Sequence, residues 1–142
     1  MADLVVTAAS VVAGTPSVTD DGTAGEALTA GQCVYLKTSD GRWYKADANV
    51  TATEAGTDGL KIALNNAPGA GQPVKLLRNG NVNLGATLAI GQVYVVSATA
   101  GGIAPFADLV ITNFVSILGV ATTAALLNVP SGGPLVSGAA HF

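Results

Sequence analysis

Turn-forming dipeptides punctuate this chain, and they constrain its fold more than any other feature. Asx-Gly or Gly-Gly pairs stand at 21–22, 40–41, 58–59, 79–80 and 101–102, at intervals of about twenty residues. Asx-Gly pairs favour tight hairpin turns because both central residues of such a turn need positive φ. Helix signals are weak, since residues 51–57 lack an apolar face and residues 24–30 are interrupted by glycine. Many short segments between Gly-rich turns predict an all-β fold, a jelly-roll-like sandwich or barrel of short antiparallel strands.

Three of these pairs are flanked by segments that read as strands. The clearest predicted hairpin joins residues 33–39 to residues 42–46 through a two-residue loop at Asp40-Gly41, which pairs Lys37 with Tyr44. This register places Val34, Leu36 and Trp43 on one face, which we expect to be core. A second hairpin is predicted for 73–78 and 81–84, and a third for 93–96 and 103–106. Further strands are expected at 110–117, 119–123, 126–129 and 135–136.

A faint repeat accompanies these strands. Residues 28–35 resemble residues 88–94 with a one-residue slip, and Gly-Gln pairs stand at 31–32, 71–72 and 91–92, each before a predicted strand. The spacing is irregular, which argues against a solenoid. We interpret the pairs as one strand-entry geometry used repeatedly in a single barrel or sandwich.

Charge is scarce and unevenly distributed. Only 11% of the 142 residues are charged, the net charge is -3, and Asp108 is the only charged residue between Asn79 and Phe142. Basic residues are too few and too scattered for a nucleic-acid interface, and the hydrophobicity is too high for a disordered chain. Because free monomers usually spread charge over their surface, the neutral half predicts surface covered by partners.

The chain length suggests one domain, with terminal segments that read as extended. We divide it into an N-terminal arm or first strand at 1–24, a β core at 25–129 and an extended C-terminal tail at 130–142. Such arms can add strands to a neighbouring sheet edge. We expect no secretory signal, because Asp3 stands where a basic region would be. The uncharged stretch 110–129 contains several polar residues, so we expect buried strand and no membrane contact.

The chain offers few residues for catalysis, and we predict no catalytic, cofactor-binding or metal-binding residues. His141 is the only histidine and stands next to the chain end, while Cys33 has no basic neighbour and reads as a small buried hydrophobe. One histidine and one cysteine are too few for a zinc site. Asp20, Asp21 and Glu26 lack the spacing of an EF-hand loop, and residues 69–71 lack the remainder of a phosphate-binding loop.

Two other possibilities stay open at this point. Tyr35, Trp43 and Tyr44 could form a stacking platform for a sugar or a base, although packing roles are the simpler interpretation. A hydrolase built on paired carboxylates would have to use the two glutamates, Glu26 and Glu54, or the aspartates, and nothing in the pattern favours it.

Three ordered stretches carry a resemblance to a known family. The first comprises residues 25–36 (GEALTAGQCVYL), then 40–41 (DG) and 44–48 (YKADA). The second comprises 59–64 (GLKIAL), Ala67, 71–74 (GQPV) and 79–80 (NG). The third comprises 88–97 (LAIGQVYVVS), 101–105 (GGIAP) and 117–121 (ILGVA). In this order they resemble the small capsid decoration or cement proteins of tailed bacteriophages.

The resemblance implies a β-rich structural protein of the virion, made in the host cytoplasm, that is not an enzyme and needs no cofactor. Its partners would be the major capsid protein, on the outer surface of the assembled capsid, and further copies of itself, with a dimer favoured and a trimer possible. It would stabilise neighbouring capsid subunits. The alternative is a receptor- or carbohydrate-binding β-module of a virion tail.

Overall fold

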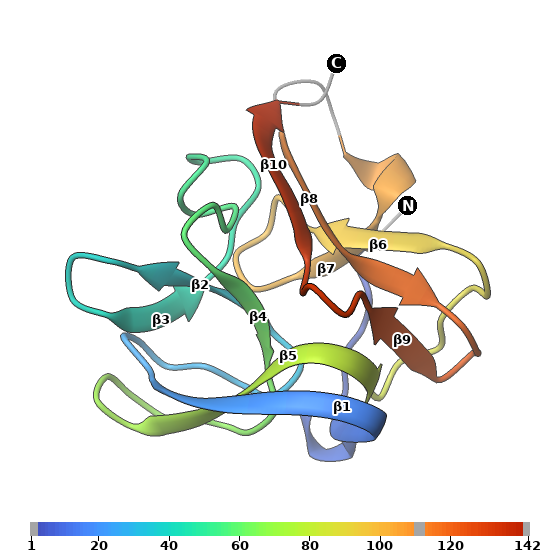
Figure 1. Ribbon diagram of the computed structural model, residues 1–142, viewed down its shortest axis with the longest axis horizontal. Coiled ribbons are helices and arrows are strands. Elements are labelled where there is room, and N and C mark those ends of the chain that lie inside the picture. Colours follow the sequence, from blue (N-terminus) through green and yellow to red (C-terminus); the bar gives the residue numbers. More distant parts are fainter. Residues whose placement is uncertain (1–2, 110–112, 141–142) are drawn as a thin grey trace.

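The computed structural model describes residues 3–109 and 113–140, and this part of the chain is nearly all β (Figure 1). Its elements, in chain order, are η1 (Ala8–Ser10), β1 (Val12–Thr23), β2 (Cys33–Lys37), β3 (Arg42–Lys45), β4 (Leu60–Ala63), β5 (Pro73–Asn83), β6 (Val93–Val96), β7 (Ile103–Pro105), η2 (Phe106–Asp108), β8 (Phe114–Ala121), β9 (Leu126–Val129) and β10 (Leu135–Ala140). Two short 3₁₀ turns are the only helical elements among the described residues.

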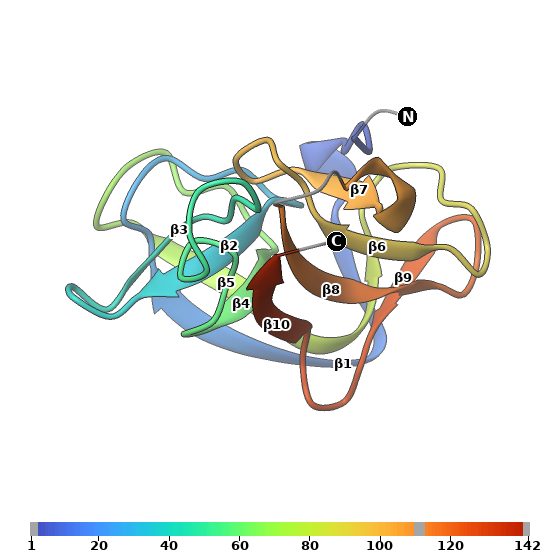
Figure 2. The same ribbon diagram turned by 90° about the horizontal axis from the view of Figure 1, so that it is seen from above.

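The strands form one curled antiparallel sheet, a half-barrel, which confirms the predicted barrel or sandwich class. The main path runs β3-β2-β4-β5-β9-β8-β6-β7. The path is symmetric about its centre. From one end inward the order is β3-β2-β4-β5, and from the other end inward it is β7-β6-β8-β9, so each strand of the first group has a counterpart four numbers higher. Figure 2 shows the two strand groups at opposite ends of the molecule. The two halves therefore repeat one strand connectivity, and the similar stretches 28–35 and 88–94 lead into its corresponding strands, β2 and β6.

Each Gly-Gln pair forms the same turn before its strand. Gly31, Gly71 and Gly91 have φ of +90°, +86° and +82°. The following glutamine N–H donates to the carbonyl three residues earlier, at 3.2, 3.3 and 3.0 Å respectively. A positive φ at the third residue with this hydrogen bond is the geometry of a type II turn. The predicted strand-entry geometry is confirmed, and β2, β5 and β6 each begin at the next residue.

The hairpin of β2 and β3 forms where Asp40-Gly41 predicts it, but the register differs. Lys37 pairs with Arg42, so the loop comprises the four residues 38–41 instead of two. The Asp40 carboxylate accepts the Arg42 N–H at 3.0 Å, and the Gly41 N–H donates to the Lys37 carbonyl at 2.9 Å. These local hydrogen bonds stabilise the wider loop.

The altered register leaves the predicted faces intact. The shift is two residues along β2, and side chains alternate with a period of two. Val34 and Trp43 are buried in one hydrophobic cluster, with Leu36 packed against it, as expected. The opposite face is covered too, because Tyr35 is buried in a second cluster.

The predicted hairpin at Asn79-Gly80 is wrong, because both residues lie inside the single strand β5. Gly80 does adopt positive φ, +100°, but inside a strand. β1 pairs with β5 from Val12 opposite Asn83 to Thr23 opposite Pro73, and this long partner keeps the chain extended. The positive φ of Gly80 bends β5 at the point where its neighbouring strand changes from β4 to β9.

The third predicted hairpin and the later strands agree better with the structure. β6 pairs with β7, from Val96 opposite Ile103 to Tyr94 opposite Pro105. The segments expected at 110–117 and 119–123 are one strand, β8, although residues 110–112 lie outside the described residues. β9 matches its predicted range. Across the described residues, no helix is both long enough and apolar enough to span a membrane.

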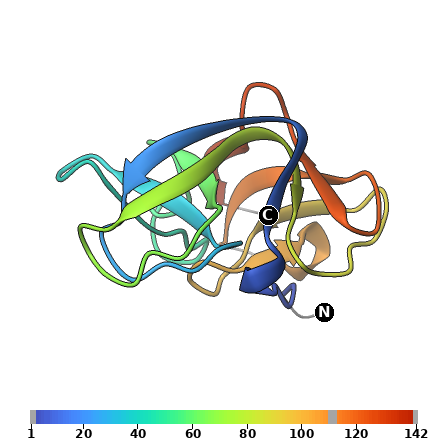
Figure 3. The same cartoon turned by 90° about the horizontal axis from the view of Figure 1, so that it is seen from below.

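The two segments predicted as arms pair within the chain. β1 and β5 run side by side across the molecule (Figure 3), and β10 pairs with β8 through Leu135 opposite Ile117. The segment before β1 is also anchored, since the Leu4 N–H donates to the Ile103 carbonyl at 2.8 Å. Neither described segment projects away as a free arm.

The core has two parts. The larger hydrophobic cluster combines side chains from both halves of the chain, among them Ile62 and Leu77 with Val95, Leu118 and Leu127. The smaller cluster lies in the first half, around the residues Leu28, Val34, Trp43, Val74 and Leu76.

Candidate interaction surface

The aromatic residues of the first hairpin do not share one exposed face. Trp43 is buried, and β1 passes so close that a Cβ on Gly22 would lie 2.8 Å from its ring. The Lys61 ammonium lies 5.2 Å from the centroid of the Trp43 ring. This indole therefore packs in the smaller cluster and is covered on its outer side.

Tyr35 and Tyr44 lie on the other face, with ring centroids 6.0 Å apart. Tyr35 is buried, and this burial, reinforced by the negative charges of Glu54 and Glu26, raises the pKa of its hydroxyl. The Tyr44 hydroxyl donates to Asp40 at 2.6 Å, a bond that raises the pKa of Tyr44 and lowers that of Asp40. The ring of half-buried Tyr44 is also within 5.1 Å of the Lys37 ammonium.

Cys33 is a core residue. Cys33 is fully buried, its thiol donates to the Gly102 carbonyl at 3.0 Å, and burial raises its pKa to about 12. A thiol held in this way is a packing group, since the thiolate is the nucleophile and the metal ligand. His141 lies outside the described residues.

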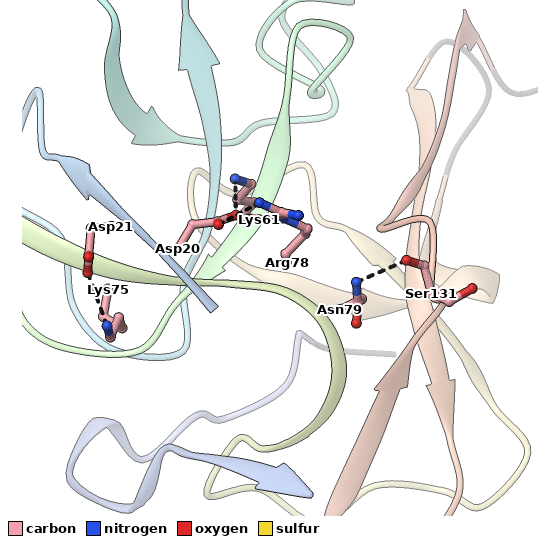
Figure 4. Close-up of polar contacts among 7 residues, drawn as sticks. All are labelled: Asp20, Asp21, Lys61, Lys75, Arg78, Asn79 and Ser131. Atoms are coloured by element: carbon pink, nitrogen blue, oxygen red, sulfur yellow. Dashed lines mark hydrogen bonds and ion pairs between the residues drawn. The ribbon is translucent and has the colours of Figure 1, made fainter. Parts of the chain in front are cut away.

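The acidic residues singled out in the sequence have separate partners. Asp20 accepts from Lys61 at 2.6 Å and from Arg78 at 2.7 Å, while Asp21 pairs with Lys75 at 3.1 Å (Figure 4). The hydrogen bonds from Arg78 and then Lys61 lower the pKa of Asp20 to about 2.

The two glutamates near Tyr35 make different hydrogen bonds. The Glu26 carboxylate accepts the backbone N–H of Lys45 at 2.9 Å. Glu54 belongs to a loop in which its own N–H donates to the Thr51 hydroxyl at 3.1 Å. Within the described ranges, no group of three or more His, Cys, Asp or Glu side chains could hold a metal ion.

The remaining candidate feature is an apolar surface in the second half of the chain. We define the apolar face by six side chains from β6, η2, β8, β10 and the turn before β6: Ile90, Val93, Phe106, Ile117, Val120 and Leu135. Ile90 is included because Gly91 and Gln92, which follow it, line the same hollow as Val93, Phe106 and Ile117. Val93 pairs with Val120, and a register shift in β8 then pairs Val95 with Ile117, which also pairs with Leu135. Because Val93 and Val95 are two positions apart, these cross-strand pairs point to the same side of the sheet. Val93, Phe106 and Ile117 together line a shallow hollow of about 470 Å³.

Three of the six side chains of the apolar face are exposed, and Val93, Phe106 and Ile117 are half-buried against the larger core cluster. Ile90 is 73% exposed, Leu135 58% and Val120 38%. All six residues lie in the half of the sequence whose only charged residue is Asp108. The scarcity of charge after Arg78 was the signal in the sequence for such a surface, but the sequence did not indicate which side chains would meet.

Comparisons with known proteins identify no family for this chain. No family model matches it, and searches of curated proteins and of solved structures also return no match.

Proposed function

We propose that this chain is a structural virion protein that binds the outside of an assembled phage capsid and stabilises neighbouring major capsid protein subunits. The observation that carries the proposal is the apolar face in the half of the chain whose only charged residue is Asp108. Interface centres are depleted of charged residues, and exposed aliphatic patches mark contact sites. The resemblance of three ordered sequence stretches to phage decoration proteins points in the same direction.

The proposal assigns a contact role and no chemistry. It places the chain on the outer surface of the capsid, after synthesis in the host cytoplasm. It includes self-association, because symmetric contacts suit a protein bound at lattice axes. A dimer is the favoured form, and a trimer is possible. Analytical ultracentrifugation of the purified chain measures this part, and a monomer at all concentrations contradicts it.

Particle binding provides the principal test. We expect the chain to copurify with virions of the phage that encodes it, in a copy number near that of the major capsid protein. Ile90→Lys places a charge on the apolar face. We expect it to weaken binding to virions from which this chain has been removed by about tenfold or more. Val50→Lys is the matched control, because Val50 is 51% exposed and lies outside the face.

Two results contradict the proposal. One is the absence of the chain from purified particles. The other is equal particle binding by Ile90→Lys and Val50→Lys when both variants melt at the wild-type temperature.

A further inference from the structure

A fork in the sheet opens beside Arg78. β5 pairs with β4 through Leu77 opposite Ile62, and pairs with β9 only from Gly80 opposite Val129. Arg78 and Asn79 lie between these pairings and are paired with neither β4 nor β9. On the other edge of β5, Val18 faces Asn79 and Thr19 faces Leu77, so Arg78 is an extra residue in the register. Bulges of this kind redirect a side chain and occur often beside binding sites.

A groove lies at this fork. It has a volume of about 400 Å³ and is lined by residues 56–61, Arg78, 132–134 and Val136. Next to the groove, the Asn79 side-chain amide donates to the Ser131 carbonyl at 2.9 Å and so joins β5 to the turn before β10 (Figure 4). Four of the lining residues are glycines, so the main chain forms much of the wall. The N–H groups of Gly56, Gly59 and Gly133 already donate to carbonyls of the chain.

Two cations are held in position at the groove. Asp20 accepts from Nε of Arg78 at 2.8 Å and from its Nη2 at 2.7 Å, and it also accepts from Lys61. The Arg78 side chain is nevertheless 54% exposed, and its Nη1 carries donors outside this pair of bonds. Asp20 neutralises one of the two positive charges, so the three groups together retain one positive charge.

The walls of the groove suit an extended chain. Pro134 and Val136 line it, while β8 occupies the opposite edge of β10. Across the groove, Leu60 and Lys61 belong to the part of β4 that β5 has left. Leu60 and Lys61 therefore offer a short strand edge without a β5 partner, and the preoriented guanidinium beside it offers one carboxylate contact.

We propose that this groove binds an extended segment of a partner protein, with a carboxylate side chain of that segment placed on Arg78 and Lys61. Asp58 lines the same groove from an exposed loop and opposes the bound carboxylate by like charge. The proposal does not depend on the virion role, because the apolar face and this groove are formed by different residues.

A peptide titration tests the groove directly. The probe is the capped peptide Val-Thr-Asp-Val-Thr, added to the full ¹⁵N-labelled chain, with the same peptide carrying Asn in place of Asp as its control. We expect shifts of the amides of Gly56, Gly59, Gly132 and Gly133, and about tenfold weaker binding of the Asn peptide. Equal affinity for both peptides, or shifts confined to other residues, overturns the proposal. Equal shifts with inorganic phosphate alone also overturn it, because they indicate a simple anion site.

Variants locate the contact. Arg78→Gln is expected to weaken binding about tenfold, and Asp58→Asn to strengthen it about twofold. Lys75→Gln is the matched control, because Lys75 lies on the same strand, is 52% exposed and pairs with Asp21. We expect Lys75→Gln to bind as the wild type does, and an equal loss in Lys75→Gln and Arg78→Gln contradicts the proposal. If Arg78→Gln melts below the titration temperature, Arg78→Lys carries the test, with an expected loss of about threefold.

Discussion

At the scale of single residues, glycines decide where strands approach one another closely. Gly80 combines a φ of +100° with contact distances that leave no room for a side chain. A Cβ at this position would clash with the Pro16 carbonyl oxygen and would lie 2.5 Å from the Ser17 Cα. Both atoms are backbone, so neither can move aside without displacing β1.

Gly80→Ala should therefore destabilise the protein by roughly 2–3 kcal/mol, from strained φ and the clash with β1. Urea unfolding measures the loss. Gly132→Ala is the control, because a Cβ there meets no atom within 4 Å, and we expect a change of at most about 0.5 kcal/mol. Equal stability of the two variants would show that β1 does not pass over Gly80 as described.

At the scale of elements, one carboxylate connects three strands. Asp20 on β1 bonds Lys61 on β4 and Arg78 on β5. Its side chain is 21% exposed, whereas that of Asp21, which bonds Lys75, is 86% exposed. Exposed pairs contribute little to stability, so the two neighbouring aspartates should differ in effect.

The Asp20 contribution should depend on pH in a definite direction. Its pKa is lowered from 3.8 to about 2 in the folded state, so the stabilisation is complete above 3.8 and is lost as the pH falls toward 2. The difference in unfolding free energy between the wild type and Asp20→Asn should shrink over this interval. Thermal melts between pH 7 and pH 2 measure it. A constant difference over the whole range refutes the role of the charge, and Asp21→Asn should have a small effect throughout.

β10 is an integral strand, and its alternation provides another prediction. Val136 packs against the larger core cluster, whereas Leu135 is exposed. Val136→Ser should destabilise the fold by about 1–2 kcal/mol through lost apolar burial, and Leu135→Ser by at most about 0.5 kcal/mol. Chemical denaturation distinguishes them. Equal effects would indicate that β10 is a loosely attached arm.

At the scale of the whole molecule, the repeated connectivity does not divide the protein into two independent units. β5 pairs with β4 of the first group and with β9 of the second. The larger core cluster likewise contains residues of both groups, for example Ile62 and Leu118. Burial of apolar surface is therefore shared between the halves.

This shared core predicts one cooperative unfolding transition. Trp43, the only tryptophan, reports on the first half, while far-UV circular dichroism reports on the strands of both. The two urea curves should coincide. A Trp43 transition at lower urea than the circular dichroism transition would indicate separate units.

Sequence by itself determined the features that depend on neighbouring residues. The Gly-Gln turns, the alternation along β2 and β3, and the bounds of β9 follow from local φ preferences and from the period of two along a strand. It also indicated that the second half would present a neutral surface, because charge can be counted without a structure.

Tertiary structure alone decided the rest, because strand pairing joins residues that are far apart in the chain. Asn79-Gly80 has the composition of a hairpin turn, yet pairing with β1 keeps β5 extended through it. The same pairing places Asp20 beside Arg78, although 58 positions separate them. Register between β8, β6 and β10 likewise assembles the apolar face. Local propensities are worth fractions of a kcal/mol to about 1 kcal/mol per residue, and the pairing of a long strand outweighs them.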